Sequence, residues 1–244
     1  MKKIIYFIGV FIFIFTSSFS IDMSSTTFDK RIDYGDGGYK EIVFKNKGLS
    51  NVRYKIKVLD VSKTGSKRKD MSKWVTVFPK VINIPPMQEK TLKIFAKSPN
   101  NAEKGEYIFG LKVEPIAIPT IRKAEDNKIV GNSIVTITPL VEMIGYVGDP
   151  KFKENIVFED IKVEKVEDIY KLSGTIFNKT YAGKHVGFNF IGANNTLVDG
   201  KYLGRLPANS NHKINVDVKH SFKEISIYDG DTLDEIKRIK LPKI

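Results

Sequence analysis

The segment Trp74–Pro115 constrains the fold more than any other part of the chain. Apolar residues alternate with polar ones along three runs of this segment, Ile82–Ile84, Leu92–Ala96 and Tyr107–Val113. A period of two places one face of a strand in a core. Because proline-rich and polar turns separate the runs, the segment predicts three short strands of a half-buried sheet.

The remaining chain continues this pattern, and almost no stretch supports a long helix. Turn signals recur roughly every 8 to 12 residues, which is typical of β-sandwiches. We therefore predict an all-β fold with two Ig-like antiparallel β-sandwich domains in tandem. Outside the opening segment, the predicted strands are Thr26–Ile32, Gly38–Asn46, Val52–Asp60, Ile134–Tyr146, Ile156–Val163, Ile169–Asn178, His185–Ile191, Lys213–Val218, Glu224–Tyr228 and Ile236–Leu241.

A weak internal sequence repeat, called the internal echo below, supports the division into two halves. Ile84–Ile94 and Leu206–Val216 share an apolar residue, a proline one position later, and apolar residues eight and ten positions on. Phe44–Gly48 and Ile176–Thr180 each end a strand in an Asn-centred turn. Repeats this far apart indicate a duplicated domain, since solenoid units span about 20 to 50 residues.

The best boundary is Gly148-Asp149-Pro150, where the strand pattern stops. We expect an N-terminal Ig-like domain at residues 21–147 and a C-terminal β-sandwich at residues 148–244. At Asp229-Gly230, between two alternating runs, the sequence predicts a hairpin. The acidic run that follows lacks the spacing of a calcium loop, so we expect no metal there.

Residues 1–20 resemble a secretory signal peptide, with Lys2 and Lys3, an apolar run Ile4–Phe15 and small residues at Ser18 and Ser20. The alternative is a membrane anchor, but a span takes about 20 apolar residues and this run is shorter. We expect a cleaved signal, a periplasmic protein and no stable membrane insertion. The chain has no cysteine, so its stability must come from core burial without disulfides.

The formal charge of the 244 residues is +12. A basic surface favours acidic partners and electrostatic steering, or is simply a solvated face. Nucleic acid is excluded as a partner, because the chain is exported and its lysines are spread over nearly every strand, away from stacking aromatic residues.

Catalytic and metal-binding patterns are missing from the sequence. The three histidines, His185, His212 and His220, have no metal-ligand spacing, and no serine stands in a Gly-x-Ser-x-Gly motif. No Gly-rich phosphate loop occurs. We therefore predict a binding protein that is not an enzyme and has no cofactor. Trp74, the single tryptophan, could line a glycan site or belong to the core.

The candidate binding surface is the strand that ends the first domain, residues 133–147. Its odd-numbered apolar residues form a row, which Pro139 interrupts. Proline cannot donate to a sheet ladder, so Pro139 indicates an edge strand or a bulge. An apolar edge strand can take up a strand of another chain, and the alternative is that the row packs into its own sandwich. The row consists of Val135, Ile137, Val141 and Met143.

The opening segment also resembles the N-terminal domain of PapD-like periplasmic pilus chaperones. The residues that carry this resemblance are Phe78, Pro79, Ile82, Ile84, Pro85, Lys90, Leu92 and Ile94. Pro85-Pro86 replaces the family's proline-glycine turn, so the match is that of a divergent member. The resemblance implies a chaperone that caps pilus or fimbrial subunits by donating an edge strand, with an outer-membrane usher as a further partner.

The resemblance also implies roles for single residues. Val135 and Ile137 would be donated to the subunit, with Ile134 taking over if the register is shifted by one residue. The family holds the subunit's terminal carboxylate with two basic residues, and Lys30 or Arg31 lies where one is expected. The second basic position falls close to Glu142, whose negative charge could not hold a carboxylate.

Two other classes of function stay open at this point. One is an exported two-domain Ig-like adhesion or scaffold module that binds a surface partner without delivering it. The other is a protein that binds cell-wall glycans through Trp74 and the basic surface.

Overall fold

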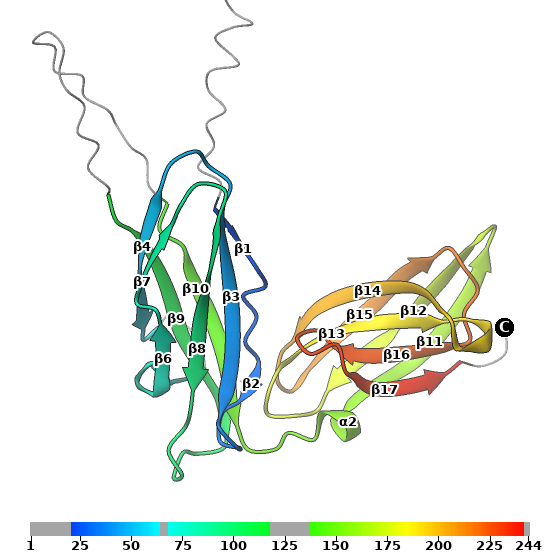
Figure 1. Cartoon of the computed structure of the whole chain (residues 1–244). Helices are drawn as coiled ribbons and strands as arrows, with labels where there is room; N and C mark the ends of the chain where they lie inside the picture. The colour runs from blue at the N-terminus through cyan, green and yellow to red at the C-terminus, as the bar shows by residue number, and fades with distance from the viewer. Residues whose placement is uncertain (1–20, 64–67, 118–136, 242–244) are drawn as a thin grey trace, which may run out of the picture.

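The computed structural model describes residues 21–63, 68–117 and 137–241, and it is built almost entirely of strands (Figure 1). Hydrophobic side chains form two separate clusters, one from residues 23–147 and the other from residues 152–241. We call the parts around them the first and the second sandwich. The predicted all-β fold with two Ig-like sandwiches is confirmed. The signal peptide predicted at residues 1–20 lies outside the described residues.

The first sandwich packs two sheets together. One sheet has the order β1 (Ile21–Met23), β3 (Gly38–Asn46), β8 (Glu89–Ala96), β6 (Val75–Phe78). The other has the order β2 (Lys30–Arg31), β10 (Leu140–Val147), β9 (Gly105–Pro115), β4 (Val52–Leu59), β7 (Val81–Ile84), with β5 (Lys69–Asp70) also beside β9. A 3-10 turn, η1 (Ser72–Trp74), precedes β6.

The first strand of an Ig-type sandwich can be shared between its sheets, and this chain does so. β1 pairs antiparallel with β3, whereas β2 pairs parallel with β10 in the opposite sheet. Phe28 and Ile32, on either side of β2, are buried in the core. The crossing from one sheet to the other is therefore held by apolar burial, and it leaves β2 as a two-residue strand.

The second sandwich has seven strands in two sheets. One has the order β11 (Ile156–Val166), β12 (Ile169–Asn178), β15 (Ser210–Val218). The other has the order β14 (Leu197–Leu206), β13 (Lys184–Ile191), β16 (Glu224–Asp229), β17 (Glu235–Lys240). The short helical turns α2 (Phe152–Asn155) and η2 (Ala193–Asn195) precede β11 and β14. β16 and β17 form the predicted hairpin around Asp229-Gly230.

The internal echo corresponds to one hydrogen-bonded structure in each sandwich. The side-chain amide of Asn46 donates to the carbonyls of Ser50, Ile84 and Pro85 at 2.8–3.1 Å. The amide of Asn178 donates to the carbonyls of Ala182, Leu206 and Pro207 at 2.9–3.3 Å. In both cases a buried asparagine at the end of a strand ties its own turn to the proline turn of the echoed segment.

The second sandwich follows the first after Val147. Gly148 has a φ of +93°, a conformation that disfavours side chains, and a Cβ there would lie 2.6 Å from the Tyr181 hydroxyl. The two sandwiches form the arms of an L, which meet beside β2 and the lower end of β3 (Figure 1). We propose residues 21–147 and 148–244 as the domains. In the described part of the chain, no helix has the length and apolar character of a membrane span.

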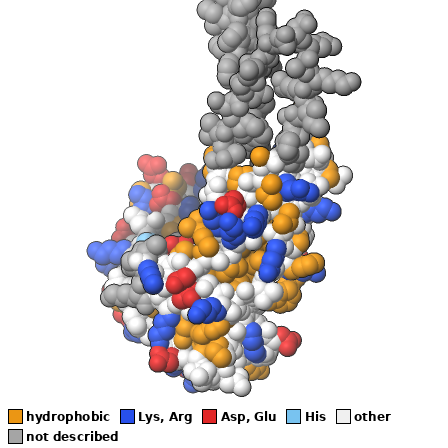
Figure 2. All heavy atoms as spheres, turned by 90° about the vertical axis from the view of Figure 1, so that its left-hand side faces the viewer, with side chains coloured by type: hydrophobic (Ala, Val, Ile, Leu, Met, Phe, Trp, Pro, Cys, Tyr) orange, Lys and Arg blue, Asp and Glu red, His pale blue; other side chains and the backbone are white. Residues whose placement is uncertain are grey.

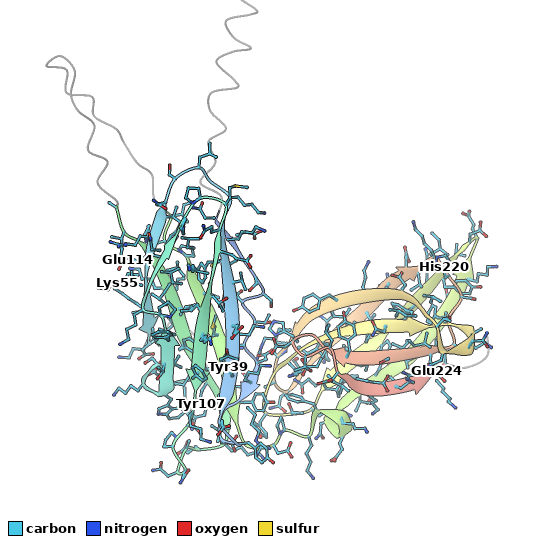
Figure 3. All side chains as sticks on the ribbon, viewed as in Figure 1. Tyr39, Lys55, Tyr107, Glu114, His220 and Glu224 are labelled. Atoms are coloured by element: carbon cyan, nitrogen blue, oxygen red, sulfur yellow. The ribbon has the colours of Figure 1, made fainter. Side chains whose placement is uncertain are left out.

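The surface of the first sandwich carries basic and apolar side chains side by side. Figure 2 shows Lys and Arg side chains spread over this face between hydrophobic ones, without one dominant basic patch. On the outer face of the β4 and β9 pair, Lys55 lies opposite Glu114 (Figure 3). The ion pairs of Glu114 are with Lys57 and Lys112, at 2.6 and 3.3 Å.

Candidate partner-binding edge and the joint between the sandwiches

β10 is flanked by a full-length partner on one side only. It pairs with β9 along its whole length, from Leu140 opposite Lys112 to Val147 opposite Gly105. On its other side, β2 pairs with β10 only at Gly145 and Tyr146. Among the described residues, no strand pairs with this side of β10 from Leu140 to Ile144. We call this stretch the free edge.

Two hydrogen bonds fix which way the backbone of β10 points. The Val113 N–H donates to the Pro139 carbonyl at 2.9 Å, so the carbonyl before β10 points toward β9. The Ile32 N–H donates to the Tyr146 carbonyl at 2.9 Å, so that carbonyl points the other way. Since successive residues of a strand alternate, odd-numbered residues pair with β9 and even-numbered ones turn outward. At the free edge, the N–H and C=O groups of Leu140 and Glu142 therefore point away from β9, toward the side on which no described strand pairs.

The side chains of β10 alternate in the same way. Met143 is 1% exposed in the core, and Val141 is partly buried against the same cluster. The even-numbered residues Leu140, Glu142 and Ile144 are exposed or half-buried on the outer face.

This alternation corrects one predicted site residue. Met143 cannot be offered to a partner, because its side chain fills the interior of the first sandwich. Val141 also packs on that core, so within β10 the odd-numbered row belongs to its own sandwich. Ile137, just before the strand, is 80% exposed, and its binding role stays a prediction. Ile134 and Val135 lie outside the described residues.

Lys30 and Arg31, the predicted carboxylate anchors, form β2 and lie beside the lower end of β10. Lys30 Nζ is 2.6 Å from a carboxylate oxygen of Asp231 in the second sandwich. Arg31 pairs with Asp33 at 3.0 Å and approaches Asp149 at 4.0 Å. Both cations are thus engaged by carboxylates of the chain itself. Their anchor role stays a prediction, and a partner's carboxylate would have to displace these groups.

Asp231 belongs to the second sandwich, and its carboxylate contacts two lysines of the first sandwich. Its side chain is 1% exposed, and Lys40 of β3 lies 2.7 Å from it, in addition to Lys30. The turn that carries it is fixed from behind, because Asp229 accepts hydrogen bonds from the N–H groups of Asp231 and Thr232. The hairpin between β16 and β17 therefore presents one carboxylate to two lysines.

Asp29 makes the reciprocal contact, from the first sandwich into the second. Its side chain is 1% exposed, and it accepts hydrogen bonds from the His185 N–H at 3.1 Å and from Arg205 Nε at 3.1 Å. The His185 ring nitrogen Nδ1 also contacts it. Arg205 continues to Glu106 of β9, which also accepts the Gly183 N–H. We call these residues the interdomain ion cluster: Asp29, Lys30, Lys40, Glu106, His185, Arg205 and Asp231.

The ion cluster lowers the pKa of both buried aspartates. Burial acts to raise the pKa of Asp29, but the hydrogen bond from His185 and the charge of Arg205 outweigh it. Burial likewise acts to raise the pKa of Asp231, and its hydrogen bonds with Lys30 and Lys40 outweigh it. Both carboxylates are therefore ionised at neutral pH, as the ion pairs across the joint require.

Sequence reasoning missed most of the ion cluster. Its members are far apart in the chain, and Asp231 lies in an acidic run whose spacing predicts no contact with the first sandwich. The one local signal was Asp229-Gly230, which predicts the hairpin but not what its tip contacts. Pairing across a domain joint leaves no periodic pattern, so it could not be read from spacing.

Other candidate sites have ordinary structural roles. Trp74 is partly buried and packs on Tyr107, with ring centroids 4.8 Å apart, which favours its core role over a glycan site. His185 lies in the ion cluster, whereas His220 lies at the far end of the second sandwich (Figure 3). Within residues 21–63, 68–117 and 137–241, no group of three His, Asp or Glu side chains could hold a metal ion.

Several solved chaperone structures align with most of this chain at low sequence identity. The E. coli chaperone DraB aligns with a TM-score of 0.45 and 11% identity, over 93% of this chain and 97% of that one. The Salmonella enterica SafB chaperone, solved with the SafA pilin, aligns with a TM-score of 0.45 and 14% identity, over 93% and 98%. CsuC of Acinetobacter baumannii, solved with the CsuE tip subunit, aligns with a TM-score of 0.39 and 14% identity, over 92% of this chain and 99% of that one.

The chain is similar to solved pilus chaperones. No family model and no curated protein matches its sequence. We base the functional proposal on the geometry of the free edge and on the sequence motif that precedes it.

Proposed function

We propose that this chain is a chaperone that binds pilus or fimbrial subunits by adding a strand of the subunit to the free edge of β10. The observation that carries the proposal is an edge strand with outward N–H and C=O groups at Leu140 and Glu142, next to exposed apolar side chains. Main-chain hydrogen bonds would supply affinity, and side chains on alternate positions would supply specificity.

The exposed side chains flanking the free edge support this use. Leu140 is 52% exposed and Ile137 is 80% exposed, although β10 belongs to a well-buried sheet. Apolar edge strands are a liability in a protein that has no partner for them. A subunit strand that covers both residues would remove this liability and shield the subunit's own apolar surface.

The partner class and location follow from the motif resemblance. A PapD-like chaperone acts in the periplasm on pilus subunits, and the SafA pilin and CsuE tip subunit are proteins of this class. An usher as second partner and export through residues 1–20 belong to the same proposal. In this role, the chain would work by binding alone.

A proline placed at the free edge tests the proposal. Glu142→Pro removes an N–H that points to solvent and leaves the β9 ladder intact, because Glu142 is an even-numbered residue of β10. Glu142→Thr is the matched control, since it keeps the N–H and suits a strand. The chain and a candidate pilin-like subunit would be produced together and purified from the periplasm.

We expect a one-to-one complex with the parent chain and with Glu142→Thr, and at least about tenfold less complex with Glu142→Pro. Ile137→Asp should also weaken the complex while the free chain stays folded. If Glu142→Pro binds as much subunit as the parent, strand addition at β10 is wrong. Binding of a surface partner that survives both changes would favour an adhesion or scaffold module instead.

A further inference from the structure

The outer face of the free edge carries a single charge between two apolar side chains. Leu140, Glu142 and Ile144 share this face, and Glu142 lies opposite Gly110 of β9. Glycine offers no side chain to a cross-strand pair, and a Cβ at this position would lie 2.9 Å from the Leu140 side chain. The side chains of Val61 and Leu140 thus cover Gly110. The Glu142 carboxylate stands without a cross-strand partner on β9.

The nearest basic side chain on β9 is engaged elsewhere. Lys112 lies opposite Leu140, diagonal to Glu142, but its Nζ is 3.3 Å from Glu114. Glu114 is itself 2.6 Å from Lys57 of β4. Within the described part of the chain, no ion pair or side-chain hydrogen bond involves the Glu142 carboxylate. The charge therefore stands unpaired on the outer face, where a side chain directly opposite it on an added strand could meet it.

We propose that Glu142 selects the strand that binds here, favouring a Lys or Arg directly opposite it, with apolar residues two positions away on either side to face Leu140 and Ile144. This inference rests on the proposed strand addition. Side chains directly opposite each other in a sheet lie about 4.5–5.5 Å apart at Cβ, and opposite charges there stabilise the pair. Like charges at the same position are destabilising.

The charge preference at Glu142 is opposite to that of the whole chain. A formal charge of +12 attracts acidic partners from a distance. The negative charge of Glu142 at the binding edge favours a positively charged residue at one position of the partner strand. Long-range attraction and local register would then be set by different charges, and a partner that is acidic overall would still present one basic residue here.

Peptides of a single design can measure this selection. The probe is a nine-residue peptide, acetylated and amidated, that alternates Val and Thr and carries Lys, Gln or Glu at its central position. Affinity for the full chain would be measured by fluorescence anisotropy at low and at high salt. The variants are Glu142→Gln and Glu142→Lys. Glu89→Lys is the control, because it makes the same charge change at an exposed position of β8 in the opposite sheet.

We expect the parent chain to bind the Lys peptide about threefold to fivefold more tightly than the Gln peptide and to bind the Glu peptide most weakly. Glu142→Gln should remove this order, Glu142→Lys should reverse it, and Glu89→Lys should keep it. High salt should reduce the preference.

Equal binding of the three peptides would overturn charge selection and leave strand addition standing, provided that Glu142→Pro abolishes binding. An unchanged order in Glu142→Lys would also overturn it, and would leave Glu142 as a charge that merely discourages unwanted edge pairing. If none of the peptides binds the parent chain while Glu142→Pro still disrupts the subunit complex, the charge selection is wrong and the strand addition stands; if Glu142→Pro leaves that complex intact as well, both are wrong.

Discussion

At the scale of single residues, buried polar side chains fix the positions of the turns and of the joint. Asn46 and Asn178 each bond three carbonyl groups, and Asp29 and Asp231 each reach across the joint to two cationic or ring donors. A buried polar group that loses its partner costs far more than an ordinary hydrogen bond contributes. Single changes at these residues should therefore have large effects.

Asn46→Ala should destabilise the first sandwich by about 3 kcal/mol, because it leaves buried carbonyls near Ile84 without a donor. Trp74 is the only tryptophan and packs on the first core, so its fluorescence during urea unfolding reports that sandwich. Asn178→Ala should lower the stability seen by circular dichroism and shift the Trp74 transition less. A Trp74 midpoint that is unchanged in Asn46→Ala would contradict this role.

Gly183→Ala should weaken the joint. A Cβ at Gly183 would lie 2.3 Å from the Arg205 guanidinium, which is held in place by Asp29 and Glu106 and cannot move aside without losing them. We expect a loss of about 2–4 kcal/mol. The control is Gly200→Ala in β14, where the nearest atom to a Cβ is 3.5 Å away. Equal stability of the two variants in urea unfolding would show that Arg205 is not confined.

Contacts of single polar residues were the part of the structure least predictable from the sequence. The Asn-centred turns were visible as an echo, since both halves repeat the asparagine and the proline turn that it contacts. The partners of Asp29 are 156 and 176 positions away along the chain. No local propensity encodes contacts at that distance, so only the three-dimensional fold reveals them.

At the scale of elements, the alternating pattern was a good guide wherever a strand has one buried face. The prediction for Gly38–Asn46 matches β3 at both ends, and Ile169–Asn178 matches β12. β14 was missed because Gly200 and Gly204 interrupt its pattern and most of its side chains are at least partly exposed. β10 begins at Leu140, after Pro139, and residues 137–139 are not part of it, while the predicted start at Ile134 lies outside the described residues.

The direction of β10 separates core residues from surface ones, and a pair of substitutions can test it. Met143→Ala should cost about 2–5 kcal/mol, because it leaves a cavity in the first core. Ile137→Ala should cost less than about 0.5 kcal/mol, because that side chain is 80% exposed. Urea unfolding followed by Trp74 fluorescence measures both. The reverse order would mean that the odd-numbered row faces outward.

At the scale of the whole molecule, the interdomain ion cluster ties the orientation of the sandwiches to the region beside β10. Lys30 lies in β2, next to Gly145 of β10, and holds Asp231 of the second sandwich. A partner on the free edge would therefore meet a surface whose lower end is fixed by the second sandwich. The sequence predicts the two sandwiches but not the contact of the second sandwich with the region beside β10, since the angle of a joint depends on contacts between residues distant in the chain.

The joint should resist mild acid and open in strong acid. The pKa values of Asp29 and Asp231 lie below the ordinary 3.8, so their stabilisation is complete above that pH and is lost as the pH falls through the folded-state values. Asp231→Asn should be less stable than the parent at pH 6, and the difference should shrink toward about pH 2.5. Urea unfolding across this range measures it, and a difference that is constant with pH would contradict the ion pairing.

Amide hydrogen exchange along β10 tests the central claim most directly. In the free chain, the N–H groups of Val141 and Met143 should exchange slowly, because they bond to β9, while those of Leu140 and Glu142 should exchange quickly. In the complex with a co-purified pilin-like subunit, Leu140 and Glu142 should become slow as well. Fast exchange of these two amides in the complex, or slow exchange already in the free chain, would contradict strand addition at this edge.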